Sequence, residues 1–371
     1  MDVSRKDHLT TTEKTFTLHP EVSLTSVTNV VVKVLTEETK SHVAKKPPPK
    51  WGEVVVLVGT STAGKTSIIS ELVKQKPEMI ERGIDSAWVG IPLNYLNKHH
   101  PEEMAFLEKV IEPAKDDIEN YGYILSYVET GREPKFKTGV SVKEKDQYQE
   151  VVKKLYDSLC KGIPGDTPEK YAQSIITCMM DEIILESKQG RPIACDILQV
   201  NEVALETVKI KVPSVKFALV YVPFQTLAER VIKRNNKALS EGNFGDARPG
   251  VFPLEQFTKL FRPRNDSDLD SEIVQKLTLG EVKHAIDTVF ENSKTFLKST
   301  NQSLDELEKK TVHLRGIILE RFGFKEGDDP NKVVELTPSY KGYHMLINTA
   351  RGDKSKSEVV QEAVKQILVK D

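Results

Sequence analysis

Runs of consecutive apolar residues along the chain predict the strands of a buried parallel sheet. Residues 54–58 are all valine or leucine, and further strands are predicted within residues 190–198 and 215–222. Continuous runs of this kind are typical of strands that are buried on both faces. Residues 343–349 predict a last strand, and the β-rich residues 27–35 predict a strand that pairs at a sheet edge.

Between these strands, apolar residues recur at the three- and four-residue spacing of helices. The pattern predicts helices within residues 106–111, 171–185, 226–236, 281–290 and 357–368. Each places its apolar side chains on one face, which suits packing against a sheet. Strands that alternate with such helices predict an α/β protein.

The first strand leads into a loop that matches the phosphate-binding pattern G-x-x-x-x-G-K-[ST]. Its residues, which we predict to bind a nucleotide, are Gly59, Thr60, Ser61, Thr62, Ala63, Gly64, Lys65, Thr66 and Ser67. The glycines let backbone N–H groups converge on phosphate oxygens. Lys65 brings a positive charge to the β- and γ-phosphates, and Thr66 offers its hydroxyl to Mg²⁺. We therefore predict a P-loop NTPase-type three-layer fold with a parallel sheet and large, mainly helical insertions.

Two aspartates follow predicted strands, where ligands bind in parallel sheets. Asp85 lies where the second strand of the core is expected to end, a position suited to chemistry, although a helix N-cap explains its spacing equally well. Asp196 ends the strand predicted beside the P-loop strand. We predict that Asp196 orders Mg²⁺ through water, as the Walker B aspartate does, with a strand-end turn residue as the alternative.

Arginines that suit phosphate binding are concentrated in the second half of the chain. Arg230 and Arg234 lie four residues apart, on one face of a predicted helix. This face is suited to close over phosphates as a lid. Arg248, in a glycine-rich loop that we expect to be mobile, and Arg262 and Arg264 beyond it compete for the same role or are surface charges.

Composition narrows the class of protein. The 371 residues include 53 Lys and Arg against 55 Asp and Glu, so the net charge of −2 argues against nucleic-acid binding as the main function. The three cysteines lack C-x-x-C spacing, which indicates neither a disulfide framework nor a structural zinc site. The sequence has neither an N-terminal apolar signal nor an apolar run long enough to span a membrane, so we expect a soluble, cytoplasmic protein with no membrane partner. Export through a different signal stays open.

Five segments resemble, in chain order, the chloramphenicol phosphotransferase-like P-loop kinases, and the zeta-toxin-like kinases share the general plan. They are the P-loop, the sequence GIDS at residues 83–86, residues 190–196, the helix with two arginines, and the strand at residues 347–349. The resemblance implies an ATP- and Mg²⁺-dependent kinase that phosphorylates a hydroxyl. It implies Asp85 as the catalytic base, and Arg230 and Arg234 as lid residues that act with Lys65 on the transferred phosphoryl group. The region of the acceptor pocket departs from the small enzymes, so the acceptor, a small molecule or a macromolecule, stays unidentified.

The remaining sequence is interpreted as additions to this kinase core. The boundaries that we predict are an N-terminal extension and proline-rich linker at 1–50, the P-loop start of the core at 51–96, a helical insertion at 97–188, the rest of the core with the arginine lid at 189–265, a second helical insertion at 266–335, and the last strand and helix of the core at 336–371.

Two other functions are compatible with a P-loop. A GTPase switch needs a base-reading [NT]-K-x-D element, and residues 236–239, with the sequence NKAL, lack its aspartate. A scaffold on a retained P-loop fold has no chemical need for Lys65, Thr66 and Asp85 together. We therefore expect a kinase that binds a nucleoside triphosphate and a hydroxyl-bearing acceptor, and we keep a nucleotide-dependent switch or scaffold without phosphoryl transfer as the alternative.

Overall fold

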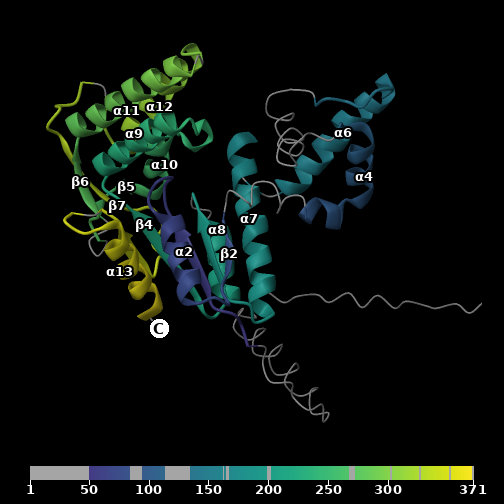
Figure 1. Ribbon diagram of the computed structural model, residues 1–371, viewed down its shortest axis with the longest axis horizontal. Helices are drawn as coiled ribbons and strands as arrows, with labels where there is room; N and C mark the ends of the chain where they lie inside the picture. Colours follow the sequence, from purple (N-terminus) through teal and green to yellow (C-terminus); the bar gives the residue numbers. More distant parts are fainter. Residues whose placement is uncertain are drawn as a thin grey trace, which may run out of the picture. The chain divides into compact units, whose positions relative to one another are not determined.

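The structure is a computed structural model, and the residues that it describes are shown in colour in Figure 1. They are residues 50–83, 94–112, 134–161, 163, 167–198, 202–266, 272–300, 303–325, 327–350 and 352–369. The chain divides into two units, Met1–Pro48 and Pro49–Asp371, and every described residue belongs to the second. The strand predicted at residues 27–35 and the candidate base Asp85 both lie outside the described residues.

Within the described ranges, five parallel strands form a central sheet. They are β1 (Val54–Val58), β2 (Ile80–Arg82), β3 (Ile193–Ile197), β4 (Val215–Tyr221) and β8 (Met345–Asn348). Their order across the sheet is β2-β3-β1-β4-β8. In this order β1 is central, and β3 and β4 pair with it on either side. The strands predicted within residues 54–58, 190–198, 215–222 and 343–349 are confirmed by β1, β3, β4 and β8.

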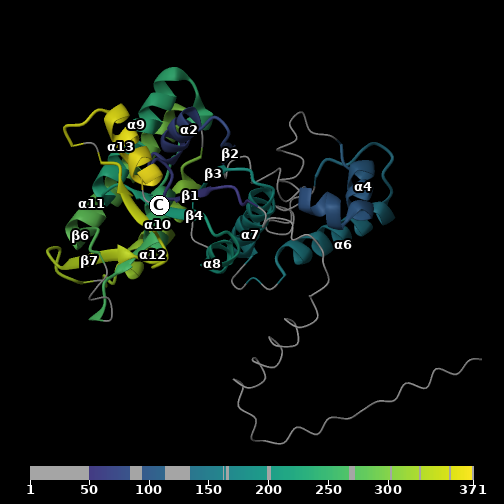
Figure 2. The ribbon, with the colours of Figure 1, turned by 90° about the horizontal axis from the view of Figure 1, so that it is seen from below.

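Helices cover both faces of the central sheet. On one face lie α2 (Lys65–Gln75) and α13 (Lys356–Val369), which run side by side in Figures 1 and 2. On the other face lie α7 (Thr167–Lys188), α8 (Glu202–Lys211) and α9 (Phe224–Glu241). The α/β fold with three layers and a parallel sheet is thus confirmed.

Side chains of β1 alternate between the two faces of the sheet, and both faces are covered, which explains why its sequence is apolar throughout. Val55 and Leu57 pack into the core beneath α2 and α13. Val54, Val56 and Val58 point to the opposite face and pack into the larger core beneath α7, α8 and α9. Because both faces are covered, all five side chains are fully buried, as expected for a central parallel strand.

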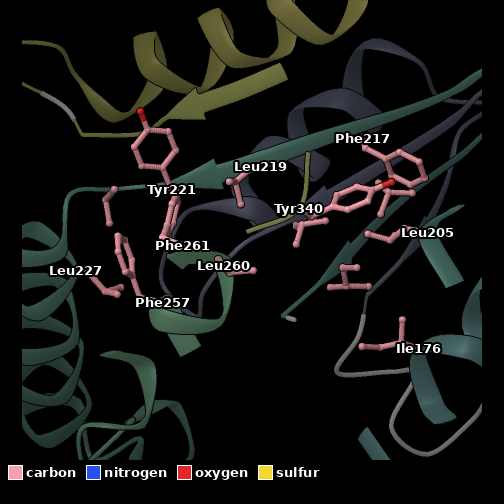
Figure 3. Packing of buried hydrophobic residues seen from close by; sticks show 14 of the residues in the cluster. Ile176, Leu205, Phe217, Leu219, Tyr221, Leu227, Phe257, Leu260, Phe261 and Tyr340 are labelled. Atoms are coloured by element: carbon pink, nitrogen blue, oxygen red, sulfur yellow. The ribbon is translucent and has the colours of Figure 1, made fainter. Parts of the chain in front are cut away.

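A second, antiparallel sheet and three further helices extend the larger core. Their bounds are α10 (Phe252–Leu260), β5 (Phe261–Pro263), β6 (Gln275–Thr278), α11 (Leu279–Ser299), α12 (Asp305–Arg321) and β7 (Val333–Pro338), with the strands in the order β5-β7-β6. Figure 3 shows Phe257 and Phe261 beside Tyr221 at the end of β4, and the ring centroids of the two phenylalanines lie 4.4 Å apart. The helix predicted within residues 281–290 is confirmed by α11, whereas β6 was not predicted.

Two helices of the first half of the chain form a smaller core of their own. These are α4 (Pro101–Val110) and α6 (Val142–Leu159), which bury Met104 and Tyr148 between them. Ser141 and Glu144 form a capping box at the start of α6. Among the residues that the structure describes, no helix is both long enough and apolar enough to cross a bilayer.

Candidate functional site

The P-loop joins β1 to α2 in a conformation that suits anion binding. Its backbone is left-handed at Thr62, with φ of 68°, and at Gly64, with φ of 102°. Left-handed residues among right-handed ones turn successive N–H groups toward one concave side. Gly64 is also the N-cap residue of α2 and supplies no side-chain cap, so the first amides of the helix adjoin the same concavity.

Gly59 holds this loop close to the neighbouring strands. Its N–H donates to the carbonyl oxygen of Ile197 at the end of β3, at 3.1 Å. On the other side, a Cβ at position 59 would lie only 2.2 Å from the carbonyl oxygen of Val220 on β4. Since the strands are parallel, the loop therefore emerges between two carboxyl ends, at the edge where ligands of such sheets bind.

Lys65 and Asp196 meet at this edge. The Nζ of Lys65 donates to the carbonyl oxygens of Gly59 and Thr60, at 2.9 and 3.0 Å, and lies 3.7 Å from Oδ2 of Asp196. Lys65 is 5 % exposed and Asp196 is 14 % exposed. The sequence predicted that the strand beside β1 carries this aspartate, and β3 does pair with β1. The two residues assigned to phosphate and Mg²⁺ are thus neighbours.

Arg230 and Arg234 make different contacts, although both extend from α9. Arg230 donates hydrogen bonds to the carbonyl oxygens of Thr62, Ala63 and Thr349. Arg234 donates through Nε to the carbonyl oxygen of Asp246, at 2.5 Å, and its Nη2 lies 4.0 Å from a carboxylate oxygen of the same residue. Arg230 therefore contacts the P-loop itself, whereas Arg234 contacts the short helix η1 (Phe244–Asp246).

A cavity of about 470 Å³ opens over the P-loop, between α9 and α13. Besides P-loop residues, its wall includes Arg230, Lys233, Arg234, Lys237, Ala238, Glu241, Asp246, Thr349, Lys356, Val359 and Val360. With Lys65, six basic side chains face two acidic ones. Such an excess of positive charge in a concave site attracts anions. Ala238, Val359 and Val360 add an apolar portion, so the wall suits a ligand with a polyanionic end and an apolar end.

The three competing arginines are not among the residues that line this cavity. The N–H of Arg248 donates to Oδ1 of the buried Asn235, and its guanidinium donates to the carbonyl oxygen of Ala247. Arg262 donates to the carbonyl oxygen of Pro263, and Arg264 pairs with Glu335 at 3.3 Å. The structure thus brings Arg230 and Arg234 to the P-loop cavity and places the other three elsewhere.

Two residues of the site were missed in the sequence. Thr349 follows β8 and donates through Oγ1 to the carbonyl oxygen of Ala63, at 2.5 Å. Thr349 follows a predicted strand of the parallel sheet, and because ligands bind at the carboxyl ends of such strands, this position could have identified it as a site residue. Gln256, on α10, accepts a hydrogen bond from the N–H of Ser61 at 3.4 Å; no motif or spacing marks it.

Cys195 lies beside Asp196 on β3 and is fully buried. Burial, with a smaller effect of the Asp196 carboxylate, raises the pKa of the Cys195 thiol well above its usual range. A thiol held in its protonated form is a poor nucleophile. Among the titratable groups on this strand, Asp196 is therefore the one suited to the chemistry of the site.

The residues of the site fit a nucleotide phosphate chain and a magnesium ion. The left-handed residues of the loop form a backbone concavity that suits phosphate oxygens. Thr66 lines the cavity, and the Asp196 carboxylate lies next to Lys65. Oxygen donors of these two kinds match the preference of Mg²⁺ for hard ligands, with phosphate and water completing its coordination.

Comparisons with known proteins add little to this description. No family model matches the chain, and no curated protein matches it. Among solved structures, one from the PezAT chromosomal toxin-antitoxin system of Streptococcus pneumoniae aligns over 81 % of this chain and 97 % of its own, with 15 % sequence identity and a TM-score of 0.23. A likeness this weak supports no inference, so the fold assignment depends on the sheet and the P-loop described above.

Proposed function

We propose that this protein is an ATP-dependent P-loop kinase that transfers the γ-phosphate to a hydroxyl of a small-molecule or macromolecular acceptor. The observation that carries the proposal is the cavity of about 470 Å³ over the P-loop, in which Lys65 and Thr66 meet a basic wall from α9 and α13. Phosphoryl transfer needs positioning and charge neutralisation more than covalent chemistry. This cavity offers both.

The described residues of the proposed site divide between holding the nucleotide and stabilising the transferred phosphoryl group. The P-loop amides and the start of α2 bind the phosphate oxygens. Lys65, whose Nζ now donates to the loop carbonyls, redirects its hydrogen bonds to the β- and γ-phosphates. Arg234, which lines the cavity, neutralises charge on the transferred group.

Thr66 and Asp196 are the residues that would hold Mg²⁺, Thr66 directly and Asp196 through water. When bound, the ion supplies charge neutralisation on the phosphate oxygens. In this arrangement Asp196 has a second effect, because its carboxylate is 3.7 Å from Nζ of Lys65 and attracts the ammonium group. The pair therefore holds Lys65 close to the loop.

Asp85 is the proposed catalytic base, as the resemblance to chloramphenicol phosphotransferase-like kinases implies. It belongs to the segment outside the described residues, so this assignment depends on its sequence position after β2. An aspartate there would accept a hydrogen bond from the acceptor hydroxyl and take its proton as the new P–O bond forms. The predicted insertions at residues 97–188 and 266–335 are proposed to select the acceptor.

A transfer assay tests this function. The protein, Mg²⁺ and γ-labelled ATP are incubated with a cell extract that has been separated into small molecules and macromolecules. We expect the wild type to label one fraction, and Lys65→Ala and Asp85→Asn to label neither. Lys310→Ala is a matched control, because Lys310 is an exposed residue of α12 that pairs only with nearby Glu306 in the contacts described.

The outcomes separate the kinase from its alternatives. Label in one fraction with the wild type, and its loss in both site variants, supports the kinase and identifies the acceptor class. If ATP binds to the wild type but no label reaches either fraction, the kinase proposal is rejected in favour of a nucleotide-dependent switch or scaffold. If Asp85→Asn transfers phosphate as well as the wild type, Asp85 is not the base.

A further inference from the structure

Arg230 is hydrogen-bonded to carbonyl groups of the phosphate-binding loop. One guanidinium nitrogen, Nη1, lies 3.1 Å from the carbonyl oxygen of Thr62 and 3.3 Å from that of Ala63. The other, Nη2, lies 2.5 Å from the carbonyl oxygen of Thr349. Arg230 therefore links α9, the P-loop and the segment after β8 through backbone acceptors that side-chain substitution cannot remove.

Thr349 is the second residue of this link. Its hydroxyl accepts a hydrogen bond from Nη1 of Arg230 at 3.1 Å and donates to the carbonyl oxygen of Ala63 at 2.5 Å. Its backbone N–H donates to the carbonyl oxygen of Tyr221 at 2.8 Å, which fixes it to the end of β4. The residue is 5 % exposed, so its contacts are shielded from water.

The direction of these contacts matters for the loop. In a phosphate-binding loop the N–H groups converge on the ligand, so the carbonyl groups must point away and find other donors. Arg230 supplies donors to two successive carbonyl groups, and Thr349 supplies a further one to Ala63. Thr62 also has a left-handed backbone, with φ of 68°, which is unfavourable for a β-branched residue and persists only where the surroundings hold it.

We propose that Arg230, together with Thr349, is a positioning residue that holds the P-loop in its phosphate-binding conformation, and that Arg234 alone of the two lid arginines acts on the transferred phosphoryl group. This inference rests on the proposed function. Arg230 affects the binding of the nucleotide, and Arg234 affects the transfer of the phosphoryl group. A pre-formed loop favours every nucleotide with a β-phosphate, so Arg230 acts on ADP and ATP alike. A contact to the γ-phosphoryl group favours transfer.

Equilibrium binding of fluorescent ADP and ATP analogues, with Mg²⁺, separates these effects. Arg230→Met should lower the affinity for ADP and for ATP by the same factor, about tenfold or more, because it removes charge-assisted hydrogen bonds. Arg234→Met is expected to bind ADP like the wild type and to lower the transfer rate by about 10³-fold, which is typical of an arginine at a transferred phosphoryl group. A merely structural Arg230 would lower the melting temperature and leave the affinity of the folded protein unchanged.

Thr349 offers a pair of variants that keeps the test decisive if Arg230→Met does not fold. Thr349→Val removes the hydroxyl at nearly constant volume, whereas Thr349→Ser retains it. We expect the valine variant to weaken ADP binding severalfold and the serine variant to match the wild type. Because the two residues contact the same carbonyl, the loss in the double variant Arg230→Met/Thr349→Val should be smaller than the sum of the single losses.

Two results would overturn the inference, and they differ. If the wild type binds ADP and both Arg230→Met and Thr349→Val bind it equally well, the positioning role is wrong while the nucleotide site stands. If the wild type binds neither ADP nor ATP, the proposed function fails, and the positioning role fails with it.

Discussion

Replacing Gly59 by alanine tests how tightly the P-loop is held against the sheet. An ideal Cβ at this position would lie 2.2 Å from the carbonyl oxygen of Val220 and 3.3 Å from its carbonyl carbon. Real Cβ atoms essentially never approach a heavy atom closer than 3.0 Å. The peptide group after Val220 or the start of the loop must therefore shift by about 1 Å, a displacement that backbone atoms in a packed sheet do not absorb freely.

The cost can be estimated from the same contact. Gly59 follows the β1 residue Val58, which is paired with Leu219 on β4, so the shift disturbs the central strand pair at the site. Overpacking of a close-packed core costs about 1–3 kcal/mol, and we place Gly59→Ala at the upper end, since the obstruction is backbone. For a chain of this size the melting temperature should fall by about 3–4 °C. Nucleotide affinity should also fall, because the loop moves.

Two other glycines provide matched controls. A Cβ at Gly52 would lie 1.9 Å from the carbonyl oxygen of Arg191, at the opposite end of β1 from the P-loop, so Gly52→Ala should destabilise the protein but leave the nucleotide affinity of the folded fraction unchanged. A Cβ at Gly316 would meet nothing within 4 Å. Since Gly316 lies inside α12, Gly316→Ala should raise stability by up to about 1 kcal/mol.

Thermal unfolding followed by circular dichroism, combined with nucleotide titration, measures both effects. A Gly59→Ala variant that melts with the wild type and binds ADP equally well would refute the reasoning, because the loop could then move away from β4 without cost. A variant that loses stability but binds nucleotide normally would show that the spacing between β1 and β4 matters for the fold and not for the phosphate site.

Further predictions concern the site, the lid and the α4–α6 core. Asp196→Asn should lose the gain in ADP affinity that Mg²⁺ brings to the wild type, as a titration with and without the ion would show. Asn235→Ala should cost about 1–3 kcal/mol in chemical denaturation, because the N–H of Arg248 loses its buried acceptor at 2.7 Å. Hydrogen bonds from the Ser141 N–H and hydroxyl, and from Lys109, lower the pKa of Glu144 from 4.5 to about 2. The ionised Glu144 therefore stabilises the fold fully above pH 4.5, and this stabilisation is lost as the pH falls toward 2. In Glu144→Gln, an acid titration of helicity should lack this pH-dependent loss. Burial raises the pKa of Cys178 to about 12, so this thiol should react with a disulfide reagent at pH 8 only after denaturation.

The central sheet could be predicted because its strands are buried on both faces. Val54–Val58 is apolar throughout for this reason, and the P-loop motif after it identifies the carboxyl edge as the site. The position of Asp196 next to Lys65 also followed from the sequence, since an acidic residue at the end of a neighbouring parallel strand must lie at the same edge.

Other parts depend on contacts that no local pattern records. The strands β5 and β6 have three and four residues, too few for a period of two to be recognised. Gln256 reaches Ser61 across 195 positions of sequence. Arg230 and Arg234 are the same residue type, one helical turn apart, and only the groups beside them distinguish their roles. Sequence spacing placed both on the correct face and could not separate them.

The hydrogen bond between Thr349 and the P-loop has a consequence for how the protein is made. It joins residues 286 positions apart, and ribosomes add about 5–20 residues per second, so a newly made P-loop waits about 15–60 s before Thr349 is synthesised. For the earlier part of that interval β1 also lacks its neighbours β3 and β4, and throughout it lacks Thr349. The phosphate site is therefore completed late in synthesis, and a nascent chain stalled before residue 349 should fail to bind nucleotide while one extended past α13 succeeds.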